Sequence, residues 1–437
     1  MRDLSLLELL GLLRGVFVGN RFLAVAPRYS RDEMQAWQLT RIRRLVAHAY
    51  ERSAFYRSLY GEASFEPGDL RSWDDFHRLP IVTKDQVIAN FPTRILASGY
   101  DLDRLVVSRS SGSSGKVLDI AYDSRAMVTY VLAGLRLYRM GFNYRPWHRQ
   151  LYVYTSPYPL SSLFGLYPLV FIPTLAPVPQ IVEAIKTRSP DLLVCYPSHL
   201  KQVEQSLTER DLEEIHLKAI SVNSEMSTQA ERDYLASRFR CPVLDEYSSE
   251  ELTRIAGQCR HHTYHVFEDI NYVEVLREGG SGVGGVFPIV GTNLHNFAMP
   301  MIRYLQNDLG DVAEGECPCG WRFRKLVHLQ GRRNDSFMLP SGKILSSGFL
   351  LDATYEFLLN HRTAIRDFCL IQEAREAVTL QVVAGEGWNA LVQRQIEKRF
   401  VEFLEPGMRF AVAEVSECEK TKTGKRNPII SRLSRSG

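Results

Sequence analysis

The 437-residue chain is too long for one ordinary hydrophobic core, so its length predicts two or three domains. Hydrophobic residues make up 45% of the chain and charged residues 24%, a globular composition that excludes wholesale disorder. The net charge of +3 is small for this length and argues against a nucleic-acid-binding protein, because such proteins depend on many basic residues.

The cysteines and the apolar runs indicate a soluble cytoplasmic protein. Seven cysteines are an odd number in a long chain, which favours a reducing compartment over a disulfide framework. There is no run of 18 uncharged apolar residues, so no transmembrane helix is expected. The leucine-rich stretch 4–25 has near-helical spacing, and Glu8 and Arg14 interrupt the run that a signal peptide needs. It predicts a helix packed on the protein, with a membrane-surface helix as the alternative.

Residues 31–60 have helical periodicity and predict the first long helix. The next feature is SRSSGSSGK at 108–116, which stands between the apolar segments DRLVV and VLDIAYD and predicts a strand, a loop and a second strand. Small residues let successive backbone N–H groups turn toward one anion, and serine hydroxyls and a lysine add donors for phosphate oxygens. The alternative is a flexible linker. The candidate phosphate-binding residues are Ser110, Ser111, Gly112, Ser113, Ser114, Gly115 and Lys116.

Between 180 and 250 the sequence alternates between helical segments and short buried strands, which predicts a largely parallel sheet. Ser227 is placed there as the N-cap of a helix. From 263 to 305 the apolar pattern changes to period two, which is typical of antiparallel strands. After 331–336 a hairpin, a long helix and a last strand predict a compact α+β unit. We therefore expect an α/β protein with domains at 1–331 and 332–437.

Two polar segments follow predicted strands of the larger domain. Tyr247, Glu250 and Glu251 come just after a buried strand, at the sheet edge where open α/β sheets bind ligands. A carboxylate there is suited to hold Mg²⁺ against phosphate oxygens, and a solvated turn is the alternative. Asp308, in RYLQNDLGD, is placed to accept hydrogen bonds from a ribose, with an Asx-type turn as the alternative.

Two further segments belong to the domain boundary and the C-terminus. Arg332 offers a planar fork for phosphate or ribose oxygens. Asn334 tolerates unusual backbone angles and is the candidate hinge. The basic loop EKTKTGKRNP at 419–428 contains Lys425, and alone it is equally typical of a solvated tail.

In order, these motifs resemble the conserved cores of the adenylate-forming superfamily, which includes acyl-CoA synthetases, carrier-protein adenylation domains and luciferases. SSGSSGK resembles the phosphate loop STSGTTGxPK, and YSSEE resembles YGxTE. RYLQNDLG is similar to RYxTGDLG, GRRND to GRxDD, and KTKTGKR to PRTxxGKxxR. The resemblance spans about 105–428, and it implies a large adenylation domain with mixed sheets and helices and a small mobile α+β domain.

The resemblance also implies roles for individual residues. Glu251 is the magnesium ligand and, with Arg332 and Lys425, a catalytic residue. Asp308 binds the ribose, Tyr247 and Ser248 complete the nucleotide site, and Lys425 reaches the α-phosphate. Serines replace both loop threonines, Ser248 replaces the usual glycine, and Asn334 replaces the common hinge aspartate. None of these departures removes a required chemical group.

Within the superfamily the sequence is most similar to the phenylacetate–CoA ligase branch, including its CapK-type members of capsule biosynthesis. LPIVTKDQV at 79–87 resembles the LPxxTKxDL element of that branch. Many members carry cysteines and a histidine like Cys259, His265, Cys317 and Cys319, a set that matches a closed tetrahedral structural zinc site. Reduced structural cysteines are the alternative, and His261 and His262 compete with His265.

The resemblance implies ATP- and Mg²⁺-dependent, AMP-forming activation of a small carboxylic acid and transfer of the acyl group to coenzyme A. An aryl acid fits the Tyr- and Phe-rich stretch 152–169, which ordinary core packing explains as well. Transfer to a carrier protein, an amine or a sugar, or transfer of AMP itself, is the alternative activity. A zinc-stabilised interaction module with a degenerate nucleotide site is the non-enzymatic alternative. The oligomeric state stays open, with a homodimer among the options.

Overall fold

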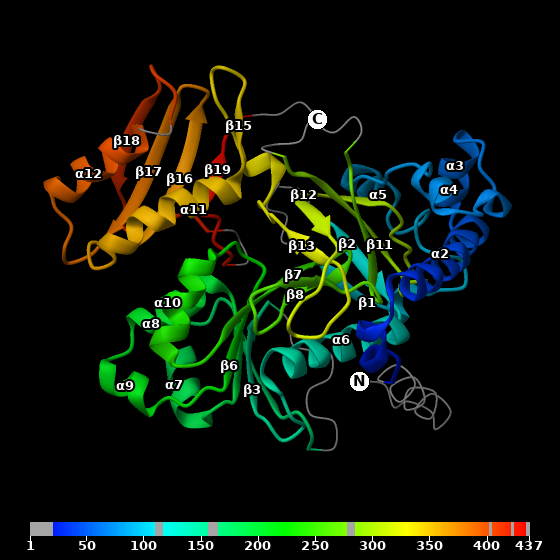
Figure 1. The fold of residues 1–437 in the computed structure, drawn as a ribbon, viewed down its shortest axis with the longest axis horizontal. Helices are drawn as coiled ribbons and strands as arrows, with labels where there is room; N and C mark the ends of the chain where they lie inside the picture. The colour runs from blue at the N-terminus through cyan, green and yellow to red at the C-terminus, as the bar shows by residue number, and fades with distance from the viewer. Residues whose placement is uncertain are drawn as a thin grey trace.

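The computed structural model describes residues 21–109, 117–155, 165–277, 285–401, 404–420 and 424–433. The predicted phosphate loop at 110–116 and most of the leucine-rich N-terminal stretch lie outside these residues. The fold is mixed α/β, as predicted, with a large sheet, surrounding helices and a smaller unit formed by the C-terminal residues (Figure 1).

The largest sheet contains eleven strands within the described ranges, in the order β10-β11-β12-β13-β9-β8-β7-β6-β5-β3-β4. The strands from β4 to β7 are parallel and the others are antiparallel. This confirms the predicted parallel region, in which helices connect successive strands. The bounds are β3 Gln150–Tyr154, β4 Leu169–Pro173, β5 Leu192–Cys195, β6 Ala219–Asn223, β7 Val243–Ser249, β8 Thr253–Gln258, β9 Tyr264–Val266, β10 Asn271–Val275, β11 Phe287–Asn293, β12 Tyr304–Ala313 and β13 Lys325–Val327.

Helices cover this sheet on both sides and bury two apolar cores against it. Their bounds are α2 Arg31–Arg52, α3 Ala54–Glu62, α4 Trp73–His77, α5 Lys84–Asn90, α6 Ser124–Phe142, α7 Val178–Arg188, α8 Pro197–Gln205, α9 Glu209–Glu214 and α10 Gln229–Phe239. The predicted N-cap of α10 is wrong by one residue, because the Thr228 hydroxyl accepts the Glu231 N–H at 2.9 Å while Ser227 accepts hydrogen bonds from Arg232. No helix in the described part of the chain combines the length and the apolar character that crossing a membrane requires.

A separate hairpin flanks the predicted phosphate loop. Strands β1, Val106–Arg109, and β2, Asp119–Tyr122, pair in antiparallel register, with Arg109 opposite Asp119. The two side chains form an ion pair at 2.7 Å. The predicted order of strand, loop and strand is therefore confirmed for the two strands.

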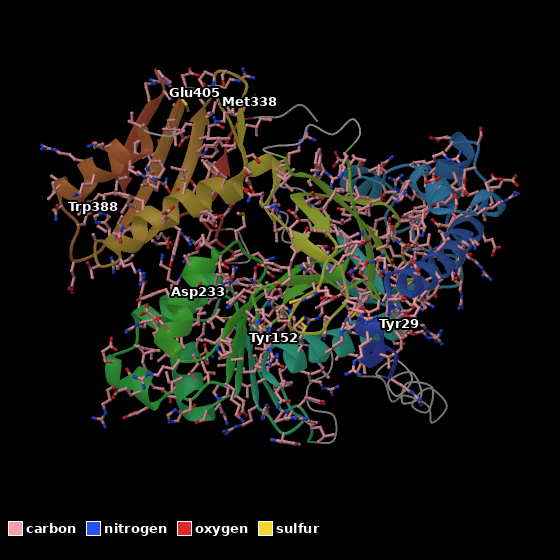
Figure 2. The ribbon with its side chains drawn as sticks, viewed as in Figure 1. Tyr29, Tyr152, Asp233, Met338, Trp388 and Glu405 are labelled. Atoms are coloured by element: carbon pink, nitrogen blue, oxygen red, sulfur yellow. The ribbon has the colours of Figure 1, made fainter. Side chains whose placement is uncertain are left out.

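The C-terminal residues form a unit with its own apolar core. In its described residues a four-stranded sheet has the order β18-β17-β16-β19 and packs against two helices (Figure 1). Trp388 and Glu405 of this unit lie at the upper left of Figure 2, Asp233 of α10 lies below them, and Tyr29 lies at the lower right. The elements are η4 Arg333–Asp335, β14 Phe337–Met338, β15 Ile344–Leu345, α11 Ser347–Leu358, β16 Ile365–Ala374, β17 Ala377–Ala384, α12 Ala390–Val401, β18 Arg409–Glu414 and β19 Ile429–Ser431.

Gly331 joins the two parts of the chain in a backbone conformation that other residues rarely adopt, with φ at +69°. A Cβ atom there would lie against the sulfur of Met226 and the hydroxyl of Ser347. Gly331→Ala is therefore expected to destabilise the protein by about 2–4 kcal/mol through backbone strain and overpacking. Gly342→Ala is the matched control, because its φ is +87° and a Cβ meets nothing within 4 Å. Scanning calorimetry should give the lower midpoint for Gly331→Ala, and equal midpoints would contradict this.

Candidate active site

Four aromatic or hydroxyl side chains gather where the parallel strands end. Tyr154 is the last residue of β3, Tyr196 follows β5, Ser224 follows β6, and Tyr247 lies near the end of β7. The Tyr154 and Tyr196 rings meet edge to face with centroids 5.8 Å apart, and the Tyr154 hydroxyl lies 3.4 Å from the Ser224 hydroxyl. Carboxyl ends of parallel strands share one sheet edge, and this edge is the ligand-binding position of open α/β sheets.

Tyr247, Asp308 and Arg332 form a connected polar group beside that edge. The Tyr247 hydroxyl donates to the Asp308 carboxylate at 2.6 Å, and the Arg332 guanidinium lies 3.9 Å from the other carboxylate oxygen. Burial raises the pKa of Asp308, while Arg332 and the Tyr247 hydrogen bond act against that rise. Asp308 lies within strand β12 and pairs across an isolated bridge with Arg332, so the Asx-turn alternative for this residue is wrong.

Two adjacent carboxylates follow β7. Glu251 is 8% exposed and accepts a hydrogen bond from the Tyr304 hydroxyl at 3.0 Å. Glu250 accepts a hydrogen bond from the hydroxyl of Ser108. Because Ser108 lies in β1, this contact places the C-terminal part of that strand at the site. Burial raises the pKa of Glu250, and the Lys425 charge lowers it.

Lys425 reaches the same edge from the C-terminal unit. Its ammonium group lies 5.6 Å from the centroid of the Tyr196 ring, a cation–π distance. Burial lowers the pKa of Lys425, and the charge of Glu250 is the largest influence that raises it. The positive charge of Arg332 lowers the pKa of Lys425 further, so the two basic groups at this edge act on each other electrostatically.

The structure thus brings Tyr247, Glu251, Asp308, Arg332 and Lys425 to one region, although they lie in four separate parts of the sequence. Ser248 lies beside Tyr247 at an irregular register position between β7 and β8. Asn334 lies in the short helix η4, and the positive φ at this junction belongs to Gly331. The predicted phosphate-loop residues at 110–116 lie outside the described residues.

Glu225 and Arg426 were not predicted, although both lie at this site. The Glu225 carboxylate accepts the backbone N–H of Arg426 at 2.6 Å, a contact between residues 201 positions apart. The signal for Glu225 was present in the sequence, because this residue follows the predicted strand LKAISVN and so stands at the same carboxyl edge. Nothing comparable identified Arg426, whose position depends on how the C-terminal unit packs.

A sulfur and imidazole cluster lies away from the carboxyl edge. The ligand atoms of Cys259, His265, Cys317 and Cys319 all lie within 4.8 Å of one another. The sulfurs of Cys259 and Cys317 are 3.7 Å apart, and the Cys319 sulfur is 3.2 Å from Nε2 of His265. A disulfide needs about 2.05 Å, so these thiols are not bonded. The competing histidines have other neighbours: His261 lies near Arg260, and His262 near Gln229.

The sequence comparisons identify ligases of one kind. No family model matches the chain. The chain is 25% identical over 332 residues to the phenylacetate-coenzyme A ligase of Thermus thermophilus, covering 71% of this chain and 72% of that protein. It is 26% identical over 343 residues to the phenylacetate-coenzyme A ligase of Aromatoleum evansii, covering 71% and 73%.

Solved structures match over a larger share of the chain. A 2-hydroxyisobutyryl-CoA ligase in the postadenylation state, in complex with an acyl-AMP, has a TM-score of 0.74 at 20% identity and covers 92% of this chain and 90% of that one. The same ligase in the thioesterification state, with acyl-AMP and CoA, has a TM-score of 0.59. The predicted resemblance to phenylacetate–coenzyme A ligases is therefore confirmed, and the fold is that of the adenylate-forming coenzyme A ligases.

Proposed function

We propose that this protein is an AMP-forming acid–coenzyme A ligase, which activates a carboxylic acid with ATP and transfers the acyl group to coenzyme A. The observation that carries the proposal is the convergence of Lys425, from the C-terminal unit, with Tyr247, Glu251, Asp308 and Arg332 at one sheet edge. The sequence relatives, which are phenylacetate-coenzyme A ligases, support the reaction class.

The first half of the reaction needs little from the protein besides positioning and charge. A carboxylate substrate is ionised near neutral pH, so no base has to remove a proton from it. Its oxygen forms a bond to the α-phosphorus of ATP, the bond to the leaving oxygen breaks, and pyrophosphate departs. The Lys425 ammonium stabilises the charge that develops on the α-phosphate. The acyl-adenylate then reacts with the coenzyme A thiol, which releases AMP.

The carboxylates have separate roles in this proposal. Asp308 accepts hydrogen bonds from the ribose hydroxyls, and Tyr247 and Arg332 hold its carboxylate in place. Glu251 is suited to be a ligand of Mg²⁺, because hard cations prefer carboxylate oxygens and the Tyr304 hydroxyl orients the Glu251 carboxylate. Bound Mg²⁺ offsets the negative charge of the triphosphate. The segment 110–116 is proposed as the phosphate-binding loop, supported by the contact of Ser108, in the strand that precedes the segment, with Glu250.

We propose zinc as the occupant of the cysteine–histidine cluster, in a structural role. Ligands about 2.3 Å from a tetrahedral zinc ion lie about 3.8 Å apart, close to the 3.7 Å between the Cys259 and Cys317 sulfurs. The Nδ1 atom of His265 lies 3.4 Å from the Phe323 carbonyl, so it is placed to carry the proton and leave Nε2 for the metal. Three thiolates and one imidazole fill a tetrahedral site and leave no position for water.

The experiment that tests the proposed function is an acid-dependent ATP–pyrophosphate exchange assay with the purified protein over aryl, short-chain, fatty and amino acids. The proposal predicts exchange that requires one class of acid and thioester formation when coenzyme A is added. Exchange without consumption of coenzyme A would indicate another acceptor. An absence of exchange with every acid would contradict the proposal.

Asp308→Asn is expected to raise the KM for ATP about tenfold to a hundredfold in this assay, because hydrogen bonds to a charged group contribute about 1.5–3 kcal/mol. Asp311→Asn is the matched control on the same strand, because Asp311 pairs with Arg277 at 2.6 Å and a partly exposed pair contributes little. The control should change the KM by less than about twofold. Equal KM values for the two variants would remove Asp308 from the nucleotide site.

A further inference from the structure

We infer that Glu225 is the residue of the N-terminal part that receives the lysine-bearing loop and so positions Lys425 for the first half-reaction. The charge of Glu225 acts on Lys425 and raises its pKa, but the proposed chemistry assigns Glu225 no bond-making step. Its hydrogen bonds also join the N-terminal part of the chain to Arg426, the residue that follows the proposed catalytic lysine. This inference rests on the proposed function and assigns a residue that the proposed mechanism does not include.

Glu225 is held on one side by helix α8. Its Oε2 atom accepts the backbone N–H of Ser198 at 3.0 Å, and its Oε1 atom accepts the Ser198 hydroxyl at 3.0 Å. Oε1 also accepts the backbone N–H of Arg426 at 2.6 Å, from the C-terminal unit. The carboxylate is therefore fixed by the N-terminal part of the chain and presents an acceptor to the incoming loop.

Arg426, which follows Lys425, is tied to the C-terminal unit, and Gly424, which precedes it, lies close to the N-terminal part of the chain. Arg426 is 8% exposed, and its side chain donates to the Phe368 carbonyl at 2.7 Å and pairs with Asp367 at 2.7 Å, so it is tied to its own unit. Gly424 has φ at +80°, and a Cβ there would lie 3.2 Å from a methyl carbon of Leu175. Lys425 lies between these two residues.

The Glu225 contact forms only when the C-terminal unit is seated on the carboxyl edge. In the same arrangement Lys425 lies over Tyr196. The overall arrangement is more similar to the postadenylation state of the 2-hydroxyisobutyryl-CoA ligase than to its thioesterification state, with TM-scores of 0.74 and 0.59. The hydrogen bond between Glu225 and Arg426 is therefore present in the same arrangement of the two parts that brings Lys425 to the site.

Glu225→Gln weakens the hydrogen bonding of residue 225 to Arg426 and Ser198 with little change in side-chain shape. The Arg426 and Ser198 N–H groups contact different oxygens of Glu225, so one of them must face the amide NH₂ group of glutamine. We expect acid-dependent pyrophosphate exchange to fall about tenfold or more, because a hydrogen bond to a charged group is lost. Thioester formation from a supplied acyl-adenylate should stay within about twofold, because that step does not use the lysine in this position.

Hydrogen exchange provides a readout that does not depend on activity. The amide of Arg426, followed by mass spectrometry in peptides covering 424–433, should exchange faster in Glu225→Gln than in the unmodified protein. Glu204→Gln is the control, because Glu204 is 8% exposed and its partners, Arg238 at 2.7 Å and Tyr234 at 3.0 Å, lie in the N-terminal part. The control should leave the exchange rate of this amide and both half-reactions within about twofold.

Three results would overturn the inference: equal hydrogen exchange in Glu225→Gln and unmodified protein, equal loss of both half-reactions, or the same effects in Glu204→Gln. If no acid supports pyrophosphate exchange in the unmodified protein, the proposed function fails. The hydrogen-exchange comparison still decides in that case whether Glu225 holds the loop.

Discussion

Replacing Lys425 by alanine is expected to lower acid-dependent pyrophosphate exchange about 100- to 1,000-fold, the usual effect of removing one group that stabilises developing charge. The structure places this ammonium group over Tyr196 at the carboxyl edge, in the field of Glu250 and Arg332. Thioester formation from a supplied acyl-adenylate should change far less, because the bond to the α-phosphate has already formed. The ratio of the two rates is therefore the quantity to measure.

Lys420→Ala is the matched control for this prediction. Lys420 is exposed and belongs to the same C-terminal segment, where its backbone pairs with Arg426. Removal of its side chain should leave pyrophosphate exchange within about twofold. Unchanged exchange in Lys425→Ala would contradict the role proposed for the lysine.

The second large effect is expected at the cysteine–histidine cluster. Protein purified from zinc-supplemented culture should contain one zinc ion per chain, and Cys317→Ser should lose it. The four side chains of the cluster lie in or beside β8, β9 and the segment between β12 and β13, so loss of the proposed metal should loosen the antiparallel half of the large sheet. A loss of about 3 kcal/mol or more corresponds to a thermal midpoint roughly 5–10 °C lower.

Cys241→Ser is the control for zinc content. Cys241 is 7% exposed, and burial raises the pKa of its thiol to about 12, so this cysteine is an inert buried thiol outside the cluster. Its replacement should leave the zinc content unchanged. Mass spectrometry under native conditions and calorimetry with and without a chelator measure both quantities. An absence of zinc together with a midpoint that the chelator does not change would rule out the structural metal.

The features that local pattern determines were predicted from the sequence. Buried apolar runs separated by helical segments predicted β5, β6 and β7 in parallel order, and the two strand-like segments after 331–336 predicted the β16–β17 hairpin. The N-cap error at α10 arose because Ser227 and Thr228 are adjacent and both residue types cap helices well.

The features that depend on distant packing were not predicted. Strand β13 lies between β12 and β9, a pairing across about sixty residues that no local pattern specifies. In the sequence, Asp308 was compatible with an Asx turn. In the structure it lies within strand β12, which continues through this residue and pairs with β11 and β13. The contact between Glu225 and Arg426 requires the C-terminal unit to be seated, so only the three-dimensional structure shows it.

In the proposed reaction the enzyme joins the acid to AMP before it transfers the acyl group to coenzyme A. The most direct measurement uses an acid that supports exchange, labelled with oxygen-18 in its carboxylate, together with ATP and coenzyme A. Attack of the carboxylate on the α-phosphorus, followed by cleavage of the acyl C–O bond, predicts one labelled oxygen in the AMP. Label in inorganic phosphate, or AMP without label, would contradict the proposed order of steps.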